Sequence, residues 1–124
     1  MIVAAHQPSY LPWLGYFDKM AKADLFVVMD DLQYEAQNFQ NRNRLKLASG
    51  PSWMTVPLVG DAQSARICDR RIDTAGIGGR HHWQHRIWRS LVVHYGHAPH
   101  WDAYATDLEI VFTRRWDSLL ELDL

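Results

Sequence analysis

Two groups of polar side chains follow short apolar segments near the start of the chain. Residues 2–5 lead into His6, Gln7, Ser9 and Tyr10, and residues 25–29 lead into Asp30, Asp31, Gln33 and Tyr34. A histidine, with an ordinary pKa of about 6.5, can act as a general base at neutral pH. A carboxylate can orient that base or bind Mg²⁺. If both segments are neighbouring parallel strands, the two groups meet at the sheet edge where such folds bind ligands.

A third candidate segment is 37–44, in which Asn41 and Asn43 alternate with Arg42 and Arg44. In an extended chain, alternate side chains point to opposite sides, so the asparagines would face one way and the arginines the other. Paired guanidinium groups suit a phosphate or a carboxylate. The same pair equally suits an exposed polar edge with ion pairs to nearby acids, and the residue types alone do not separate these two interpretations.

The elements that must position these residues form an α/β unit. Residues 2–5 and 25–31 read as strands, and Leu14, Phe17 and Met20 recur between them at helical spacing. Strand, helix and strand within about thirty residues imply parallel strands with a right-handed crossover. The sequence therefore predicts a βαβ unit that carries the candidate site.

The sequence pattern of the remaining residues predicts further, shorter strands and two helices. We expect a polar loop after the second strand, a hairpin of 45–47 and 53–57, a short strand within 65–72, and helices over 80–95 and 102–122. The fold class is therefore α/β, with a mostly parallel, incomplete sheet and C-terminal helices. At 124 residues the chain has the size of one domain, 1–124.

Six of the seven histidines fall within residues 81–100. His81 and His85 are four apart, as in some zinc sites, but no Glu stands at His-Glu-x-x-His spacing, so we predict no metal. On this helix we expect Trp83, Ile87 and Leu91 to be buried. His82 and Arg86 should be exposed.

Composition excludes several classes of protein. Hydrophobic residues make up 48% and charged residues 22%, which is typical of globular domains and not of disordered chains. The formal net charge of -1 argues against a general nucleic-acid binder. The single cysteine, Cys68, suits a reducing compartment, and no apolar run is long enough to span or insert into a membrane. The first residues lack a signal peptide, so we expect a cytoplasmic protein.

Several ordered motifs resemble the WbqC-like family. They are His6-Gln7-Pro8, residues 10–17 (YLPWLGYF), residues 23–27 (ADLFV), Asp30-Asp31-Leu32-Gln33-Tyr34, Asn41-Arg42-Asn43-Arg44, residues 53–58 (WMTVPL) and, more loosely, residues 95–99 (YGHAP). Members are typically nearly twice this long, so the chain resembles their N-terminal part and can be a fragment. The family occurs among bacterial O-antigen and other surface-polysaccharide genes, which implies a role near nucleotide-linked amino sugars.

The resemblance and the residues together suggest an enzyme that transfers or ligates a small acyl or aminoacyl group onto a nucleotide-linked amino sugar. The alternative is a non-catalytic module that binds a nucleotide sugar or a glycosyltransferase. The candidate catalytic residues are His6, Asp30 and Asp31. The candidate substrate-binding residues are Gln7, Tyr10, Trp13, Tyr16, Gln33, Asn41, Arg42, Asn43 and Arg44. The sequence leaves the oligomeric state open.

The cofactor also stays open, with ATP and Mg²⁺ as the candidates. Nucleotidylyl-transferase-type enzymes carry a His-x-Gly-His signature at the start of the helix after their first strand. Here the same slot reads Trp13-Leu14-Gly15-Tyr16, which keeps the glycine and replaces both histidines. If the architecture is shared, adenylation followed by amide formation is conceivable, but the histidines that stabilise the transferring phosphate are missing.

Overall fold

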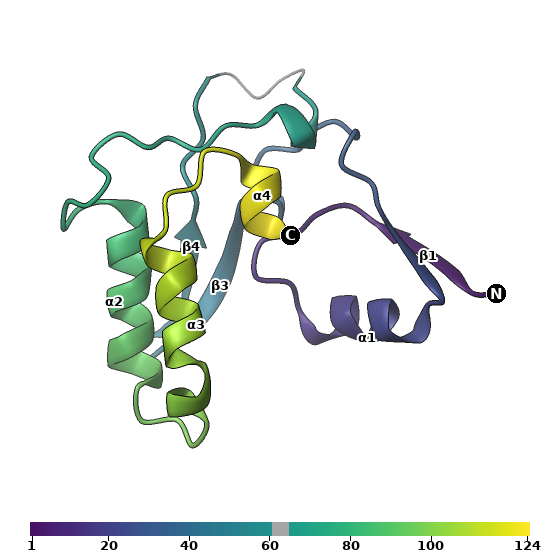
Figure 1. Ribbon diagram of the computed structural model, residues 1–124. Helices are drawn as coiled ribbons and strands as arrows, with labels where there is room; N and C mark the ends of the chain where they lie inside the picture. The colour runs from purple at the N-terminus through teal and green to yellow at the C-terminus, as the bar shows by residue number, and fades with distance from the viewer. Residues whose placement is uncertain (61–64) are drawn as a thin grey trace.

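The computed structural model describes residues 1–60 and 65–124, and its first three elements are the predicted βαβ unit (Figure 1). Strands β1 (Val3–His6) and β2 (Leu25–Val28) pair in parallel, with Val3 opposite Leu25 and His6 opposite Val28. Helix α1 (Leu14–Lys22) connects them and ends with Lys19 and Lys22 in its last turn, where cations are favoured.

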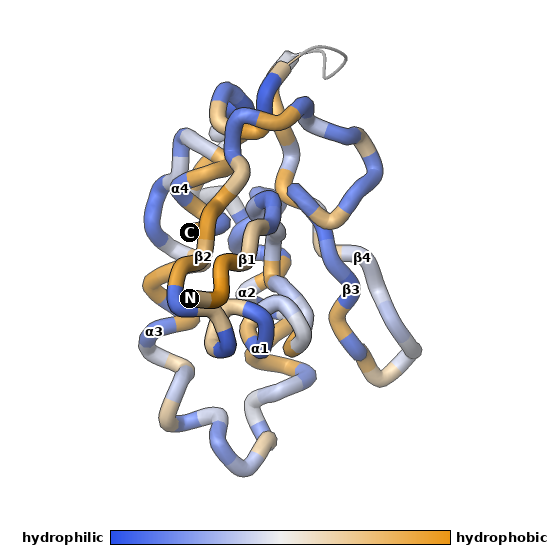
Figure 2. Tube along the Cα trace, turned by 90° about the vertical axis from the view of Figure 1, so that its right-hand side faces the viewer, coloured by the Kyte–Doolittle hydropathy of each residue, from blue (hydrophilic) through white to orange (hydrophobic). Residues whose placement is uncertain are grey.

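The β1–β2 pair has an apolar face that the described residues leave uncovered. Val3, Leu25 and Val27 are 52%, 51% and 40% exposed, and Ile2 beside them is 61% exposed. The alternate residues Ala4, Phe26 and Val28 are half-buried. Figure 2 shows this apolar pair facing the viewer at the side of the molecule.

Strands β3 (Arg42–Leu47) and β4 (Gly50–Thr55) form the predicted antiparallel hairpin, with Arg42 opposite Thr55 and Leu47 opposite Gly50. Gly50 has a φ of +112°, a conformation that side chains disfavour, and this explains a glycine at the turn. The hairpin begins at Arg42 and not at Leu45. It is separate from the β1–β2 pair, so the α/β class is confirmed with two small sheets in which only β1 and β2 are parallel.

The strand predicted within 65–72 is wrong: residues Ile67–Asp69 form a short 3-10 helix, η1. Ile67 of η1 donates from its N–H to Leu32 O at 2.9 Å, and Arg70, the residue after η1, accepts at its carbonyl oxygen from Leu119 N–H at 3.1 Å. These bonds connect three distant segments, which no local pattern could reveal.

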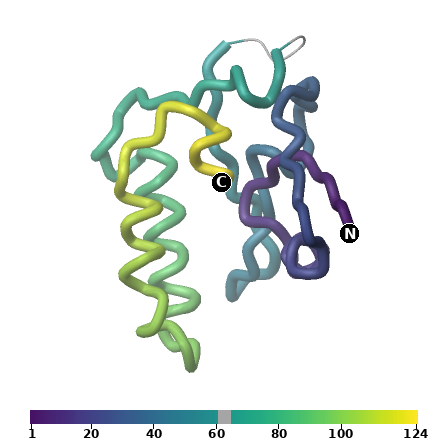
Figure 3. The backbone as a smooth tube through the Cα atoms, turned by 45° about the vertical axis from the view of Figure 1, so that its right-hand side comes forward, coloured from purple at the N-terminus to yellow at the C-terminus, as the bar shows by residue number. Residues whose placement is uncertain are grey.

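Helices α2 (Trp83–Tyr95) and α3 (Trp101–Thr113) pack side by side in the views of Figures 1 and 3. The rings of Trp88 and Trp101 stack between them, with centroids 5.8 Å apart. The single helix predicted over 102–122 is wrong, because it breaks before α4 (Leu119–Asp123). The break occurs where Ile72 N–H donates to Asp117 O at 3.0 Å.

The core joins the hairpin, η1 and the helices through one cluster of buried side chains. Its members are Tyr10, Tyr34, Met54, Val56, Ile67, Ile72, Trp83, Ile87, Leu91, Phe112 and Leu119. Trp83, Ile87 and Leu91 are therefore buried, as predicted. The prediction for His82 is wrong, since it is only 7% exposed. His82 is the N-cap residue of α2, with extended backbone, so its side chain does not follow the helical periodicity that places Arg86 outside.

Candidate functional site

The parallel register brings the ends of β1 and β2 together. Met29 N–H donates to His6 O at 2.9 Å, so the ladder extends to the point where the polar residues begin. Asp30 follows directly and is half-buried, whereas Asp31 is exposed. His6 and the two aspartates thus come from adjacent strand ends, as the sequence predicts.

The His6 ring has a defined orientation. Its Nδ1 lies 2.8 Å from Gln7 O, and a carbonyl oxygen can only accept, so Nδ1 carries a proton and Nε2 of the neutral ring is the acceptor. The ring packs edge-on against Trp13 and Tyr16, with centroids 5.5 and 5.0 Å away. A Cβ on Gly15 would lie 2.6 Å from Trp13 Nε1, so a glycine at position 15 lets Trp13 reach the histidine.

A buried carboxyl group that the sequence analysis missed lies near this cluster. Asp123 has both carboxyl oxygens buried, without a hydrogen-bond partner among the described residues, and burial raises its pKa to about 8. It is thus mainly protonated at neutral pH. Burial raises the pKa of Tyr16, and the Asp123 charge adds to that shift. Asp123 stands four positions after the buried Leu119 on α4, and an acid at a core-facing helical position is the signal that could have found it.

The loop after β1 is attached to the segment before β3 by hydrogen bonds. Gln40 Nε2 donates to Gln7 Oε1 at 3.2 Å, and Tyr10 N–H donates to Phe39 O at 2.9 Å. The Tyr10 side chain is buried in the core, with burial raising its pKa, and Gln40 is fully buried. Gln7 is therefore fixed beside His6 by a residue 33 positions later.

The two asparagines predicted to bind substrate make internal contacts. Asn41 is buried, accepts from Tyr34 Oη at 2.8 Å and donates from Nδ2 to Val56 O at 2.9 Å. Asn43 donates from Nδ2 to Leu11 O at 2.7 Å. These amide groups hold the start of the hairpin against Tyr34, Val56 and the loop after β1, so their observed contacts are structural.

Arg42 and Arg44 lie on the other side of β3, as the alternation predicts. Their guanidinium carbons lie 4.3 and 5.1 Å from the centroid of the Trp53 ring, and Phe39 packs against the same ring at 6.0 Å. Arg42 also donates to Gln37 O. We call Phe39, Arg42, Arg44 and Trp53 the arginine–tryptophan platform. It faces away from Asn43 and the first loop.

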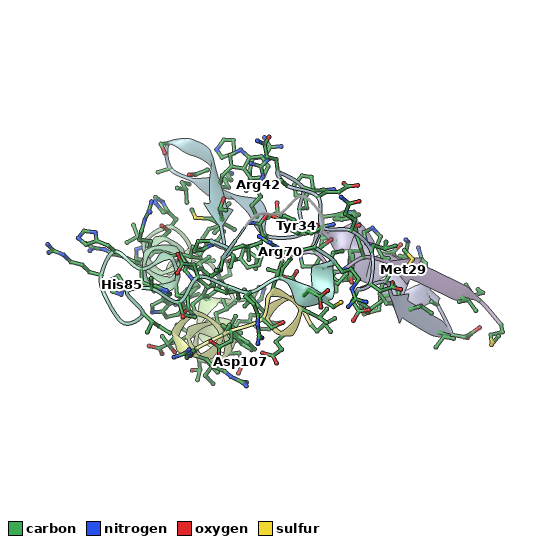
Figure 4. The ribbon with its side chains drawn as sticks, turned by 90° about the horizontal axis from the view of Figure 1, so that it is seen from above. Met29, Tyr34, Arg42, Arg70, His85 and Asp107 are labelled. Carbon is green, nitrogen blue, oxygen red and sulfur yellow. The ribbon has the colours of Figure 1, made fainter. Side chains whose placement is uncertain are left out.

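Tyr34 and Gln33 belong to the segment that connects β2 to β3. The guanidinium of Arg70 stands 4.8 Å from the Tyr34 ring centroid, and Figure 4 shows Tyr34, Arg42 and Arg70 in one region. Burial raises the pKa of Tyr34, and the charges of Arg70 and Arg42 oppose that shift. Gln33 is exposed and forms an isolated bridge with Arg66.

Neither a metal centre nor a membrane span stands out in the described part of the chain. Residues 1–60 and 65–124 contain no group of three or more His, Cys, Asp or Glu side chains arranged to hold a metal ion. None of their helices has the length and apolar character to cross a bilayer.

Comparison with known proteins identifies the family of this chain. The family model described as "WbqC-like protein family" matches residues 7–124. The chain belongs to the WbqC-like family. It is 35% identical over 121 residues to "Uncharacterized protein Rv1507c" from Mycobacterium tuberculosis, an alignment that covers 97% of this chain and 50% of the relative. The chain thus spans about half the length of this WbqC-like relative. No solved structure matches it.

Proposed function

We propose that this WbqC-like chain carries the reactive edge of an enzyme of bacterial surface-polysaccharide (O-antigen) precursor biosynthesis. The enzyme transfers or ligates a small acyl or aminoacyl group onto the amine of a nucleotide-linked amino sugar. The observation that carries the proposal is the orientation of His6, whose Nδ1 is occupied by Gln7 O and whose Nε2 is left as a base.

The chemistry follows from that orientation. The amine nitrogen of the sugar attacks the carbonyl carbon of an activated acyl donor, and His6 Nε2 takes the proton that the nitrogen loses. The carbonyl then re-forms and the leaving group departs with the bonding electrons. Trp13 and Tyr16 hold the imidazole edge-on. Tyr16 is buried, so a predicted contact of this residue with substrate is not open to it, whereas Trp13 is 52% exposed and presents apolar surface to a sugar ring. Since Gln7 O already takes the ring N–H of His6, Asp30 and Asp31 at the neighbouring strand end would stabilise the imidazolium by their charge, or bind Mg²⁺ if the acyl donor is activated by ATP.

The nucleotide part is assigned to the arginine–tryptophan platform. Arg42 follows Gln40 by two residues, about 7 Å of extended chain, and Gln40 contacts Gln7 beside the base. Because the platform faces away from the first loop, the ligand would have to pass round the start of β3, and a nucleotide sugar is long enough to do so. Stacking on Trp53 arranges the two guanidinium groups as neighbouring forks for a diphosphate.

A non-catalytic binding module is the second candidate, and one observation favours it. The platform is complete without the His6 edge, because its cations, its aromatic rings and its attachment to Gln37 all belong to the hairpin and the segment before it. Such a module would bind the nucleotide sugar, or a glycosyltransferase that carries it, without turning it over.

His6→Ala separates the two candidates. Thermal-shift screening with nucleotide-linked amino sugars and ATP first identifies a ligand, and mass spectrometry then follows acylation with a panel of acyl donors. We expect His6→Ala to lower turnover at least about a hundredfold while ligand affinity stays within a few fold, since a general base contributes about 10²–10⁴-fold. His97→Ala, an exposed histidine beyond α2, is the control. Binding without turnover in the wild type would favour the module.

A further inference from the structure

The space between β4 and the start of α2 has the features of a second ligand site. A cavity of about 320 Å³ there is lined by Thr55, Pro57, Asp73, Ala75, His81, His82, Trp83 and Arg86. A neighbouring cavity of about 340 Å³ shares Thr55, Trp83 and Arg86 with it. In Figure 4, His85 of α2 lies on the far side of the molecule from Met29 at the end of β2. The space is therefore remote from the His6 edge.

The electrostatics of this space favour an anion. Helix α2 has no acidic residue in its first turn and no side-chain hydrogen bond at its N-cap, so the N–H groups of that turn have no acceptor within the helix. Arg86 lies one turn further on and lines both cavities. A third cavity on the outer side of α2 adds Arg80 and Arg89. Among the described residues, none of these three arginines forms an ion pair with a carboxylate.

Two buried ring nitrogens point independently to a missing partner. Trp83 and His82 line the first cavity and are each 7% exposed. Trp83 Nε1 and His82 Nε2 have no hydrogen-bond partner among the described residues. An indole N–H can only donate, and leaving it unpaired in a protein interior costs free energy. Both nitrogens are shielded from solvent and both residues line the cavity, so an oxyanion bound there would supply the acceptor after a small turn of the Trp83 ring.

Asp73 and the nearby hydroxyl group make the site more specific than a phosphate pocket. One Asp73 oxygen accepts from Ala75 N–H at 2.9 Å, and the other is left for a ligand donor. Thr55 lines the same cavity and can donate or accept. Sugar hydroxyls would pair with both groups. We propose that this cavity binds a phosphorylated sugar, with its phosphate at Arg86 and the α2 N-terminus and its hydroxyls toward Asp73 and Thr55.

The test is calorimetric titration of the full chain with glucose 1-phosphate, pyrophosphate and inorganic phosphate. Arg86→Ala should weaken glucose 1-phosphate binding about tenfold or more, because a hydrogen bond to a charged group is lost. Arg115→Ala removes the same charge at an exposed position paired with Asp117, and should change the affinity less than about twofold. Trp83→Phe removes the N–H donor together with the five-membered ring of the indole, and should also weaken binding. Thermal melting confirms that each variant folds.

Asp73→Ala tests the sugar part, since it should reduce the preference for glucose 1-phosphate over inorganic phosphate. Three results would overturn the proposal: no binding by the wild type, equal losses in Arg86→Ala and Arg115→Ala, or equal affinity of the wild type for the sugar phosphate and for inorganic phosphate. The inference does not depend on the proposed acyl transfer. Loss of turnover in His6→Ala should leave this binding unchanged.

Discussion

At the scale of single residues, Asp123 is the most unusual group in the described chain. Its carboxyl has an ordinary pKa of 3.8 and a pKa of about 8 in the folded protein, because burial disfavours the charged form. Between these values the folded state binds more protons than the unfolded state, so the free energy of unfolding falls as the pH rises.

We therefore expect the Tm of the wild type to fall between about pH 4 and pH 8, with this contribution fully present below pH 4. Asp123→Asn is neutral at every pH and should remove that part of the slope. Thermal melts across this range measure it, and Asp107→Asn, at an exposed position on α3, is the control. A slope that persists unchanged in Asp123→Asn would show that the carboxyl is charged in the fold.

Asn41 allows a second prediction at this scale. Asn41→Ala leaves the Tyr34 hydroxyl and the Val56 carbonyl without their partners in the core, so it should lower the free energy of unfolding by about 1–3 kcal/mol. Urea denaturation measures this. Asn38→Ala, in the same loop but with an exposed hydrogen bond to Glu35, should cost less. Equal effects would contradict a structural role specific to Asn41.

At the scale of elements, the two faces of the hairpin carry different kinds of side chain: one face makes internal contacts, and the other carries the candidate ligand-binding arginines. Asn43 faces inward to Leu11 O, and Arg42 and Arg44 face outward onto Trp53. The alternation in the sequence was enough to predict this division. It was not enough to say that Asn41 would bond to Val56 O and Asn43 to Leu11 O, because these acceptors lie 15 and 32 positions away along the chain.

Arg42→Ala should therefore weaken nucleotide-sugar binding about tenfold to a hundredfold, and Arg42→Lys should restore part of it, since lysine lacks the planar fork. Arg44→Ala and Arg44→Lys form the second pair. Calorimetric titration with the ligand found by thermal shift gives the affinities. Unchanged affinity in both alanine variants would make the platform structural.

The sequence predicts elements well where local patterns decide them and poorly where distant backbone groups pair. The βαβ unit, the hairpin and α2 follow from apolar runs, turn residues and helical spacing. The errors at η1 and between α3 and α4 share one cause: residues 70–72 and 117–119 hydrogen-bond to each other across the chain. His6 and the arginines were recognisable from their types, whereas Asp123 becomes notable only through its burial.

At the scale of the whole molecule, the exposed apolar face of β1–β2 is the feature that stands out. Val3 and Leu25 are opposite one another in the register and are both about half exposed. An exposed apolar sheet face with open edges favours association. The matched Mycobacterium relative is twice the length of the aligned region, so additional polypeptide is available there to cover such a face.

We expect the chain by itself to self-associate as its concentration rises, and the double variant Val3→Thr/Leu25→Thr to do so less, since threonine keeps the strand preference while removing apolar surface. Light scattering coupled to size-exclusion chromatography measures this. Val59→Thr, at a similarly exposed loop position, is the control. A wild type that stays monomeric at all concentrations would contradict the expectation.

The way in which the βαβ unit is attached has a consequence for local opening. Its packing joins β1 to β2, and its connections to the hairpin run largely through loop hydrogen bonds such as Gln7–Gln40 and Tyr10–Phe39. Such a unit can detach while α2 and α3 stay folded, so its amide hydrogens should exchange with deuterium at a lower free energy than those of the helical pair. The reactive edge would then belong to the first cooperative unit to open, and a ligand that bridges His6 and Arg42 would slow its exchange selectively.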